Sequence, residues 1–80
     1  MNPEEHSLRA FLQERFASFD VQCADSADLA GVIDSLGLFD VVEFIEREFG
    51  VEVAAADFNP QRFASIRSML DFIDELRSRD

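Results

Sequence analysis

The 80-residue sequence lacks tryptophan, tyrosine and lysine, and it contains one cysteine, one histidine and three glycines. A lone Cys23 excludes an intramolecular disulfide and a cysteine-based metal framework. His6 has no partner at ligand spacing and falls on the polar side of a predicted helix, so we expect a solvated side chain. The glycines at positions 31, 37 and 50 are too scattered to form a glycine-rich phosphate loop.

Long apolar runs are absent as well. No segment approaches the roughly 20 apolar residues that a membrane-spanning helix needs, and the acidic, polar N-terminus is unlike a signal peptide. The acids Asp20, Asp25 and Asp28 do not alternate as in a calcium loop, whose glycine and terminal glutamate are missing. We therefore expect a cytoplasmic protein of one domain, residues 1–80, without a metal site or membrane contact.

Acids are abundant, because 17 Asp and Glu face seven bases, all of them arginine, for a net charge of −10. Such a charge repels nucleic acid and anionic lipid, so we expect neither as a partner. It favours docking to proteins with Arg- or Lys-rich clefts. The alternative is that the acidity serves only solubility.

Apolar residues recur at helical spacing in three stretches, which predicts an all-α fold. The first helix is expected from about Pro3 to Ala17, and the second from Ser35 to Phe49 with Gly50 as its stop. Asn59–Phe63 reads as a single helical turn, and Ser65 as the cap of the last helix. The prediction is a small bundle of three main helices plus a short third helix before the last.

The helical periodicity also predicts which side chains face the core. In the first helix Asn2 is the expected cap, and Arg9 is expected on the polar side together with Gln13, Glu14 and Arg15. Val51 and Val53 are expected to point inward, and Ala54–Asp57 to be a connector. The predicted core positions are Leu8, Phe11, Leu12, Phe16, Phe19, Phe58, Phe63, Ile66, Met69, Leu70, Ile73 and Leu76.

The second helix has one apolar side and one mixed side. At about 100° per residue, its outward side receives Leu36, Asp40 and Glu43, flanked by Phe39 and Glu46. Apolar groups exposed among charges are typical of an interaction site. The alternative is that the long loop between the first two helices covers Phe39. The predicted core stripe is Leu38, Val41, Val42, Ile45 and Phe49.

The sequence offers no credible active site. A nucleophilic serine needs a base, and the single histidine lies six residues from the N-terminus on a polar face. Ser35, however, falls in the first turn of the second helix, where free backbone N–H groups and the helix dipole favour an attached phosphate. Alternatively, Ser35 or Asp34 only caps the helix. Any chemistry at Ser35 is therefore expected to be done by another protein.

Asp34-Ser35-Leu36, followed by the run from Val41 to Val53, resembles the second helix of acyl carrier and peptidyl carrier proteins. The resemblance implies that Ser35 receives 4'-phosphopantetheine from coenzyme A through a magnesium-dependent phosphopantetheinyl transferase, which recognises Asp34. The thiol of this arm then holds an acyl or aminoacyl group as a thioester. By the same resemblance, the chain is no enzyme itself. The implied partner-docking residues are Leu36, Phe39, Asp40, Glu43 and Glu46.

Three positions depart from the fatty-acid type of carrier. Gly37 replaces the usual acid, and Glu43 replaces a residue that is commonly apolar. Arg47 interrupts the row of acids along the second helix. The pattern from Gly31 to Gly37, and Phe-Ala-Ser-Ile at the start of the last helix, are similar to free-standing D-alanyl and aminoacyl carriers. This similarity implies a monomeric carrier loaded by an adenylating ligase. Downstream condensing or transferring enzymes, as in nonribosomal peptide or polyketide biosynthesis, would then use the cargo.

Two other hypotheses remain open at this point. The chain is either an acidic helical adaptor that binds one partner through Leu36 and Phe39 without modification, or a degenerate carrier that keeps the fold and is never modified. Replacing Ser35 by alanine distinguishes the adaptor from the carrier, because only the carrier depends on that hydroxyl.

Overall fold

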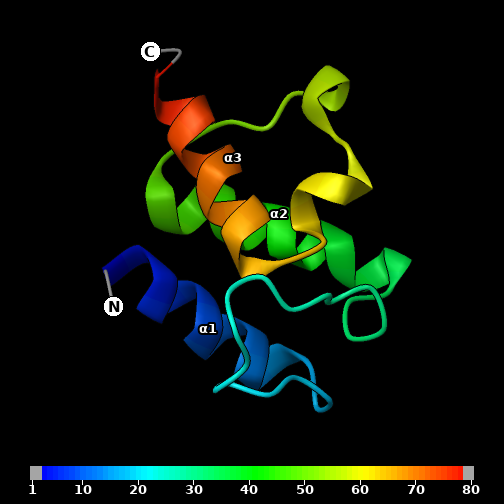
Figure 1. Ribbon diagram of the computed structural model, residues 1–80. Helices are drawn as coiled ribbons and strands as arrows, with labels where there is room; N and C mark the ends of the chain where they lie inside the picture. The colour runs from blue at the N-terminus through cyan, green and yellow to red at the C-terminus, as the bar shows by residue number, and fades with distance from the viewer. Residues whose placement is uncertain (1–2, 79–80) are drawn as a thin grey trace.

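The computed structural model describes residues 3–78, which form three α-helices, two 3₁₀ turns and no strand (Figure 1). The α-helices are α1 (Pro3–Arg15), α2 (Ser35–Phe49) and α3 (Ile66–Ser78). The 3₁₀ turns are η1 (Ala55–Asp57) and η2 (Pro60–Phe63), and both lie between α2 and α3. The predicted all-α class is thereby confirmed for the described residues.

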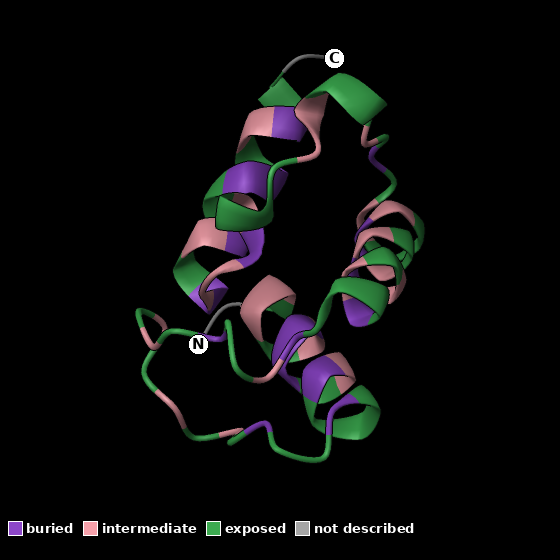
Figure 2. Cartoon of the chain, turned by 90° about the vertical axis from the view of Figure 1, so that its right-hand side faces the viewer, coloured by how far each residue is buried: buried purple, intermediate pink, exposed green. Residues whose placement is uncertain are grey.

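One apolar core lies between the helices, and the purple buried positions of Figure 2 lie on the helix sides that face one another. α3 packs against both α1 and η2. The fully or nearly fully buried apolar residues are Leu8, Leu12, Phe16, Phe19, Leu29, Ile33, Val41, Ile45, Val51, Phe63, Ile66, Met69, Phe72, Ile73 and Leu76.

The ends of α2 and α3 follow local sequence signals. Asp34 caps α2, since its Oδ1 accepts a hydrogen bond from Gly37 N at 2.6 Å. Gly50 ends α2 in the left-handed conformation at φ 65°, where glycine has no steric penalty. Ser65 Oγ accepts from Ser68 N at 3.1 Å and so caps α3. The start and the stop predicted for α2 are both confirmed.

The predicted end of the first helix is wrong by two residues, and the segments between α2 and α3 contain 3₁₀ turns. α1 ends at Arg15 rather than Ala17, because the chain turns away there to begin the long loop. The expected connector contains η1. The single helical turn predicted at Asn59–Phe63 is confirmed as the 3₁₀ turn η2, capped by Asn59 Oδ1 on Gln61 N at 3.0 Å. Because it is a 3₁₀ turn, it adds no fourth α-helix to the described chain. The expected cap Asn2 lies outside the described residues.

Some predicted core positions are only partly buried, and three core residues were missed, namely Leu29, Ile33 and Phe72. Phe72 is 1% exposed and meets the ring of Phe63 edge-on at 5.7 Å, yet it lies outside the predicted stripe of the last helix. Val51 is buried as predicted, and Val53 is half-buried. The half-buried members of the predicted core are Phe11, Leu38, Val42, Phe49, Phe58 and Leu70.

Arg9 is buried, so its predicted place on the polar side of the first helix is wrong. Only 6% of the residue is exposed. Its Nη1 donates to the carbonyl oxygens of Val21 at 3.0 Å and Cys23 at 2.7 Å, and its Nε pairs with Glu5 at 2.9 Å. The guanidinium therefore satisfies loop carbonyls that would otherwise lie against α1 without donors. This contact fixes the beginning of the long loop to α1.

The end of the long loop is held from the other side, by α3. Arg67 N donates to Asp25 O, and its guanidinium pairs with Asp25 Oδ2, both at 2.8 Å. Leu29 N donates to Ala64 O at 2.7 Å, and the side chains of Leu29 and Ile33 enter the core. The loop that leads into Ser35 is thus attached to the bundle at both ends.

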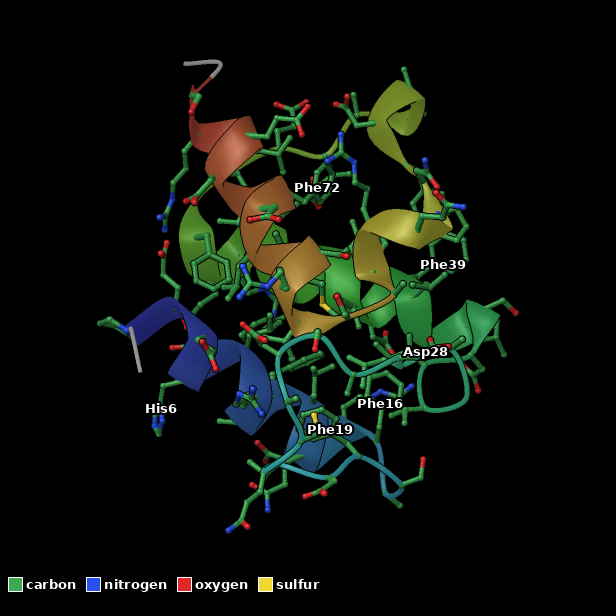
Figure 3. The ribbon with its side chains drawn as sticks, viewed as in Figure 1. His6, Phe16, Phe19, Asp28, Phe39 and Phe72 are labelled. Carbon is green, nitrogen blue, oxygen red and sulfur yellow. The ribbon has the colours of Figure 1, made fainter. Side chains whose placement is uncertain are left out.

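Gly37 lets Phe16, the residue after α1, pack closely against α2. A Cβ at this position would lie 2.4 Å from Phe16 Cε1 and 2.8 Å from Phe16 Cζ. The Phe16 ring, labelled in Figure 3, is itself only 7% exposed and has little room to move. This contact gives a physical reason for glycine at position 37.

We expect Gly37→Ala to lower the free energy of unfolding by about 1 kcal/mol. Overpacking costs roughly 1–3 kcal/mol, and the better helix propensity of alanine offsets up to about 1 kcal/mol of it. Urea unfolding followed by circular dichroism measures the change. Gly31→Ala is the matched control, because no atom lies within 4 Å of its Cβ. If both variants are equally stable, the Phe16 contact does not restrict position 37.

Candidate functional site

Asp34 and Ser35 have different roles at the start of α2. The Asp34 carboxylate caps the helix through Gly37 N, whereas Ser35 is the first helical residue and is exposed. Within residues 3–78 the Ser35 hydroxyl makes no hydrogen bond. Helix capping therefore accounts for aspartate at position 34. The Ser35 hydroxyl, in contrast, has no role in stabilising the described fold.

The direction of Ser35 follows from the packing of Gly37. Two residues along a helix lie about 160° apart around its axis. Because Gly37 is buried against Phe16, Ser35 points to the opposite, open side of α2. An incoming enzyme can reach this hydroxyl, and the free N–H groups of the first turn lie next to it. A phosphate ester at Ser35 fits this position without displacing any packed side chain.

Two large apolar side chains lie exposed beside Ser35. Leu36 is 76% exposed and Phe39 is 64% exposed, so the expectation of exposure is confirmed. The long loop does not cover Phe39, which lies at the edge of the molecule near η2 (Figure 3). Phe39 instead stacks on Phe58, with ring centroids 5.9 Å apart and an angle of 12° between the planes. Sequence periodicity did not indicate this stacking partner.

The acids on the same side of α2 are less free than the sequence suggests. Arg15 of α1 donates to Asp40 Oδ2 from Nε at 2.8 Å, and Arg47 donates to Glu43 at 2.6 Å. Both ion pairs are solvent-exposed, so water weakens but does not remove the attraction within each pair. Asp40 and Glu43 therefore each have a cation beside them before any partner arrives.

Glu46 has a third kind of contact. Its Oε2 accepts a hydrogen bond from Val53 N at 2.9 Å. This bond links the last turn of α2 to the segment that follows Gly50. Of the three predicted docking acids, Glu46 thus helps to position neighbouring backbone.

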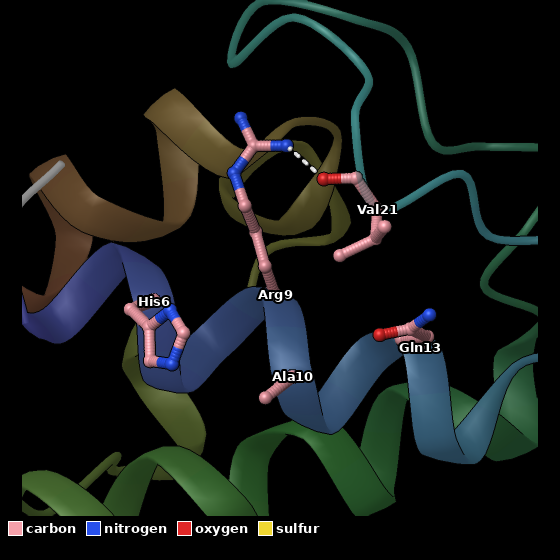
Figure 4. A pocket seen from close by; sticks show the side chains of 5 residues that line it. All are labelled: His6, Arg9, Ala10, Gln13 and Val21. Carbon is pink, nitrogen blue, oxygen red and sulfur yellow. Dashed lines mark hydrogen bonds between the residues drawn. The ribbon is translucent and has the colours of Figure 1, made fainter.

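No described cavity has the features of an active site. A pocket of about 120 Å³ on α1 is lined by His6, Arg9, Ala10, Gln13 and Val21 (Figure 4). His6 is exposed there, and the Arg9 guanidinium donates a hydrogen bond to the Val21 carbonyl oxygen. Within residues 3–78, no three His, Cys, Asp or Glu side chains are grouped to hold a metal ion. No described helix is both long and apolar enough to cross a membrane.

Comparison with known proteins gives one informative similarity. The chain matches no family model, and no solved structure matches it significantly. It is similar to a probable acyl carrier protein, PigG, of Serratia sp. (strain ATCC 39006). The two are 30% identical over 47 residues, which are 59% of this chain and 54% of PigG. The chain thus spans about half the length of this curated relative.

Proposed function

We propose that the chain is a carrier whose Ser35 bears 4'-phosphopantetheine. The proposal starts from the relationship to the acyl carrier protein family that the similarity to PigG supports. The observation that favours this most is the exposed Ser35 hydroxyl, which has no hydrogen bond, beside a cap that Asp34 already provides. A phosphopantetheinyl transferase attaches the group, and Asp34 belongs to the sequence that it recognises. The arm supplies a thiol on which the cargo is held as a thioester.

In this proposal the chain does no chemistry itself. Its residues keep Ser35 accessible, hold the start of α2 in place and offer an outward face to partner enzymes. The proposed docking face has the exposed Leu36 and Phe39 at its centre. Asp40, Glu43 and Glu46 form its acidic border. Tethering raises the effective concentration of cargo at each partner's active site.

The finer assignments extend the same proposal. We propose a cytoplasmic, monomeric carrier formed by residues 1–80, loaded by an adenylating ligase with an amino acid or short acyl unit. Condensing or transferring enzymes of a nonribosomal-peptide-like or other secondary-metabolite pathway would receive the cargo. The departures at Gly37 and Arg47 favour such partners over fatty-acid synthase enzymes.

The mass of the protein purified from its native host tests this proposal. We expect a species heavier than the bare chain by one phosphopantetheine, with a further increment that identifies the cargo. Digestion and fragment mass spectra should place both on Ser35. A population found only at the bare-chain mass would instead support the degenerate carrier.

The adaptor alternative makes a different prediction for variants in the host. An unmodified adaptor loses function with Leu36→Ala and keeps it with Ser35→Ala. A carrier loses function with Ser35→Ala, whatever Leu36→Ala does. The comparison therefore distinguishes binding alone from covalent attachment.

A further inference from the structure

Ser35 lies in a short exposed segment between two buried residues. Residues 34–36 are exposed, whereas Ile33 before them and Gly37 after them are buried. Ile33 is part of the core, and its backbone N donates to Leu29 O at 3.0 Å, which closes a turn just before α2. The segment that carries Ser35 is therefore fixed at both of its ends, although its own side chains point to solvent.

The anchor on the helix side is the contact of Gly37 with Phe16. The three atoms nearest to a Cβ at position 37 would be Cε1 and Cζ of Phe16 and Oδ1 of Asp34. That carboxylate oxygen is also the acceptor for Gly37 N, at 2.6 Å. The Phe16 ring and the cap of α2 thus meet at the same glycine, so the ring supports the turn that Asp34 closes.

Phe16 is itself held in place by its neighbours. Its backbone oxygen accepts a hydrogen bond from Phe19 N at 3.1 Å. The Arg15 guanidinium lies over the Phe16 ring, 5.2 Å from the ring centroid, and it also pairs with Asp40 of α2. Because the Phe16 residue is only 7% exposed, a close-packed ring in this place is a fixed support for α2.

We propose that Phe16 is a positioning residue for the modification of Ser35 and acts through Gly37. The proposal rests on the carrier function and adds a residue that never touches coenzyme A. In the transfer, Ser35 Oγ forms a bond to the pantetheine phosphorus, and the bond from that phosphorus to the bridging oxygen of the diphosphate breaks. Adenosine 3',5'-bisphosphate leaves, and the hydroxyl proton passes to a base of the transferase. The oxygen must lie in line with the bond that breaks, so the position of the first turn of α2 matters.

A loosened first turn would act on binding rather than on chemistry. A transferase that binds only the closed turn loses apparent affinity in proportion to the fraction of chains in which the turn is open. The chemical groups of the transferase are unchanged once the complex has formed. Loss of the Phe16 ring should therefore raise the KM for the chain and leave kcat unchanged.

The test is the steady-state rate of modification with coenzyme A, magnesium and a broad-specificity phosphopantetheinyl transferase, at varied concentrations of the chain. Phe16→Leu should raise KM by about threefold to tenfold at unchanged kcat. Phe19→Leu is the matched control, because Phe19 is also 7% exposed in the same core and is not among the nearest neighbours of position 37. Both variants are measured where urea unfolding shows them to be fully folded.

A pair of substitutions tests the contact with Gly37 directly. Gly37→Ala should raise KM, because its Cβ collides with the Phe16 ring. Leucine lacks the two ring atoms that cause this collision, so the double variant with Phe16→Leu should have a lower KM than Gly37→Ala alone. A side chain that served only stability would not rescue the KM in this way.

Amide hydrogen exchange of the unmodified chain, followed by NMR, tests the same support without the transferase. The amides of Gly37 and Leu38, which donate to Asp34 Oδ1 and Asp34 O, should exchange several-fold faster in Phe16→Leu than in Phe19→Leu. Equal exchange in both variants, equal KM in both, or a double variant no better than Gly37→Ala would each overturn the proposal. A parent chain that is never modified would instead refute the carrier function, and amide exchange would still decide whether Phe16 holds the turn.

Discussion

Arg9→Met lowers the free energy of unfolding by about 3 kcal/mol, if the buried guanidinium holds the long loop as its contacts indicate. Methionine fills a similar volume but donates no hydrogen bond, so the carbonyls of Val21 and Cys23 lose their donor. A buried acceptor without a partner costs roughly 1–3 kcal/mol. In so small a chain, whose total stability is about 5–15 kcal/mol at most, this is a large fraction.

Urea unfolding measures this loss, with circular dichroism as the signal because the chain has no tryptophan or tyrosine. Arg67→Met is the matched control, since it removes an arginine of α3 that makes an exposed ion pair with Asp25 of the same loop. An exposed pair is worth about 0–1 kcal/mol, so the control should remain close to the parent. Equal stability of the two variants would show that Arg9 does not hold the loop.

The elements that the sequence predicted well are those with local signals. The bounds of α2 follow from a capping Asp34 and a left-handed Gly50, and both act within one helical turn. The exposure of Leu36 and Phe39 follows from periodicity, because one apolar stripe suffices to orient a helix.

The features that the sequence did not predict depend on contacts between distant segments. Arg9 counts as polar on a helical wheel, and only the fold brings the carbonyls of Val21 and Cys23 to its guanidinium. The pairing of Asp40 with Arg15 requires α1 and α2 to lie side by side, 25 residues apart in sequence. The stacking of Phe39 on Phe58 likewise depends on how the chain turns after α2.

These distant contacts change the interpretation of the candidate site more than that of the fold. Ser35 and Asp34 keep the places that were predicted for them, at the exposed start of α2. The acids do not form a free row, because Asp40 and Glu43 each have an arginine partner and Glu46 accepts from backbone. The proposed docking face is therefore better defined by the exposed Leu36 and Phe39 than by its charge.

The second large effect that we expect is that Ser35→Ala abolishes modification completely. The reaction needs the Ser35 oxygen itself, since the alanine side chain has no atom to which the phosphate of coenzyme A can be attached. The fold should not change, because the hydroxyl makes no hydrogen bond within residues 3–78 and Asp34 still caps α2. Ser26→Ala, which removes an exposed hydroxyl from the long loop, is the matched control.

The most direct measurement is the intact mass of the chain after incubation with coenzyme A, magnesium and a broad-specificity phosphopantetheinyl transferase. The parent chain and Ser26→Ala should each gain the mass of one phosphopantetheine, and Ser35→Ala should gain nothing while retaining the same circular dichroism spectrum. A parent chain that stays at its original mass, or a Ser35→Ala variant that gains the same increment, would contradict the account.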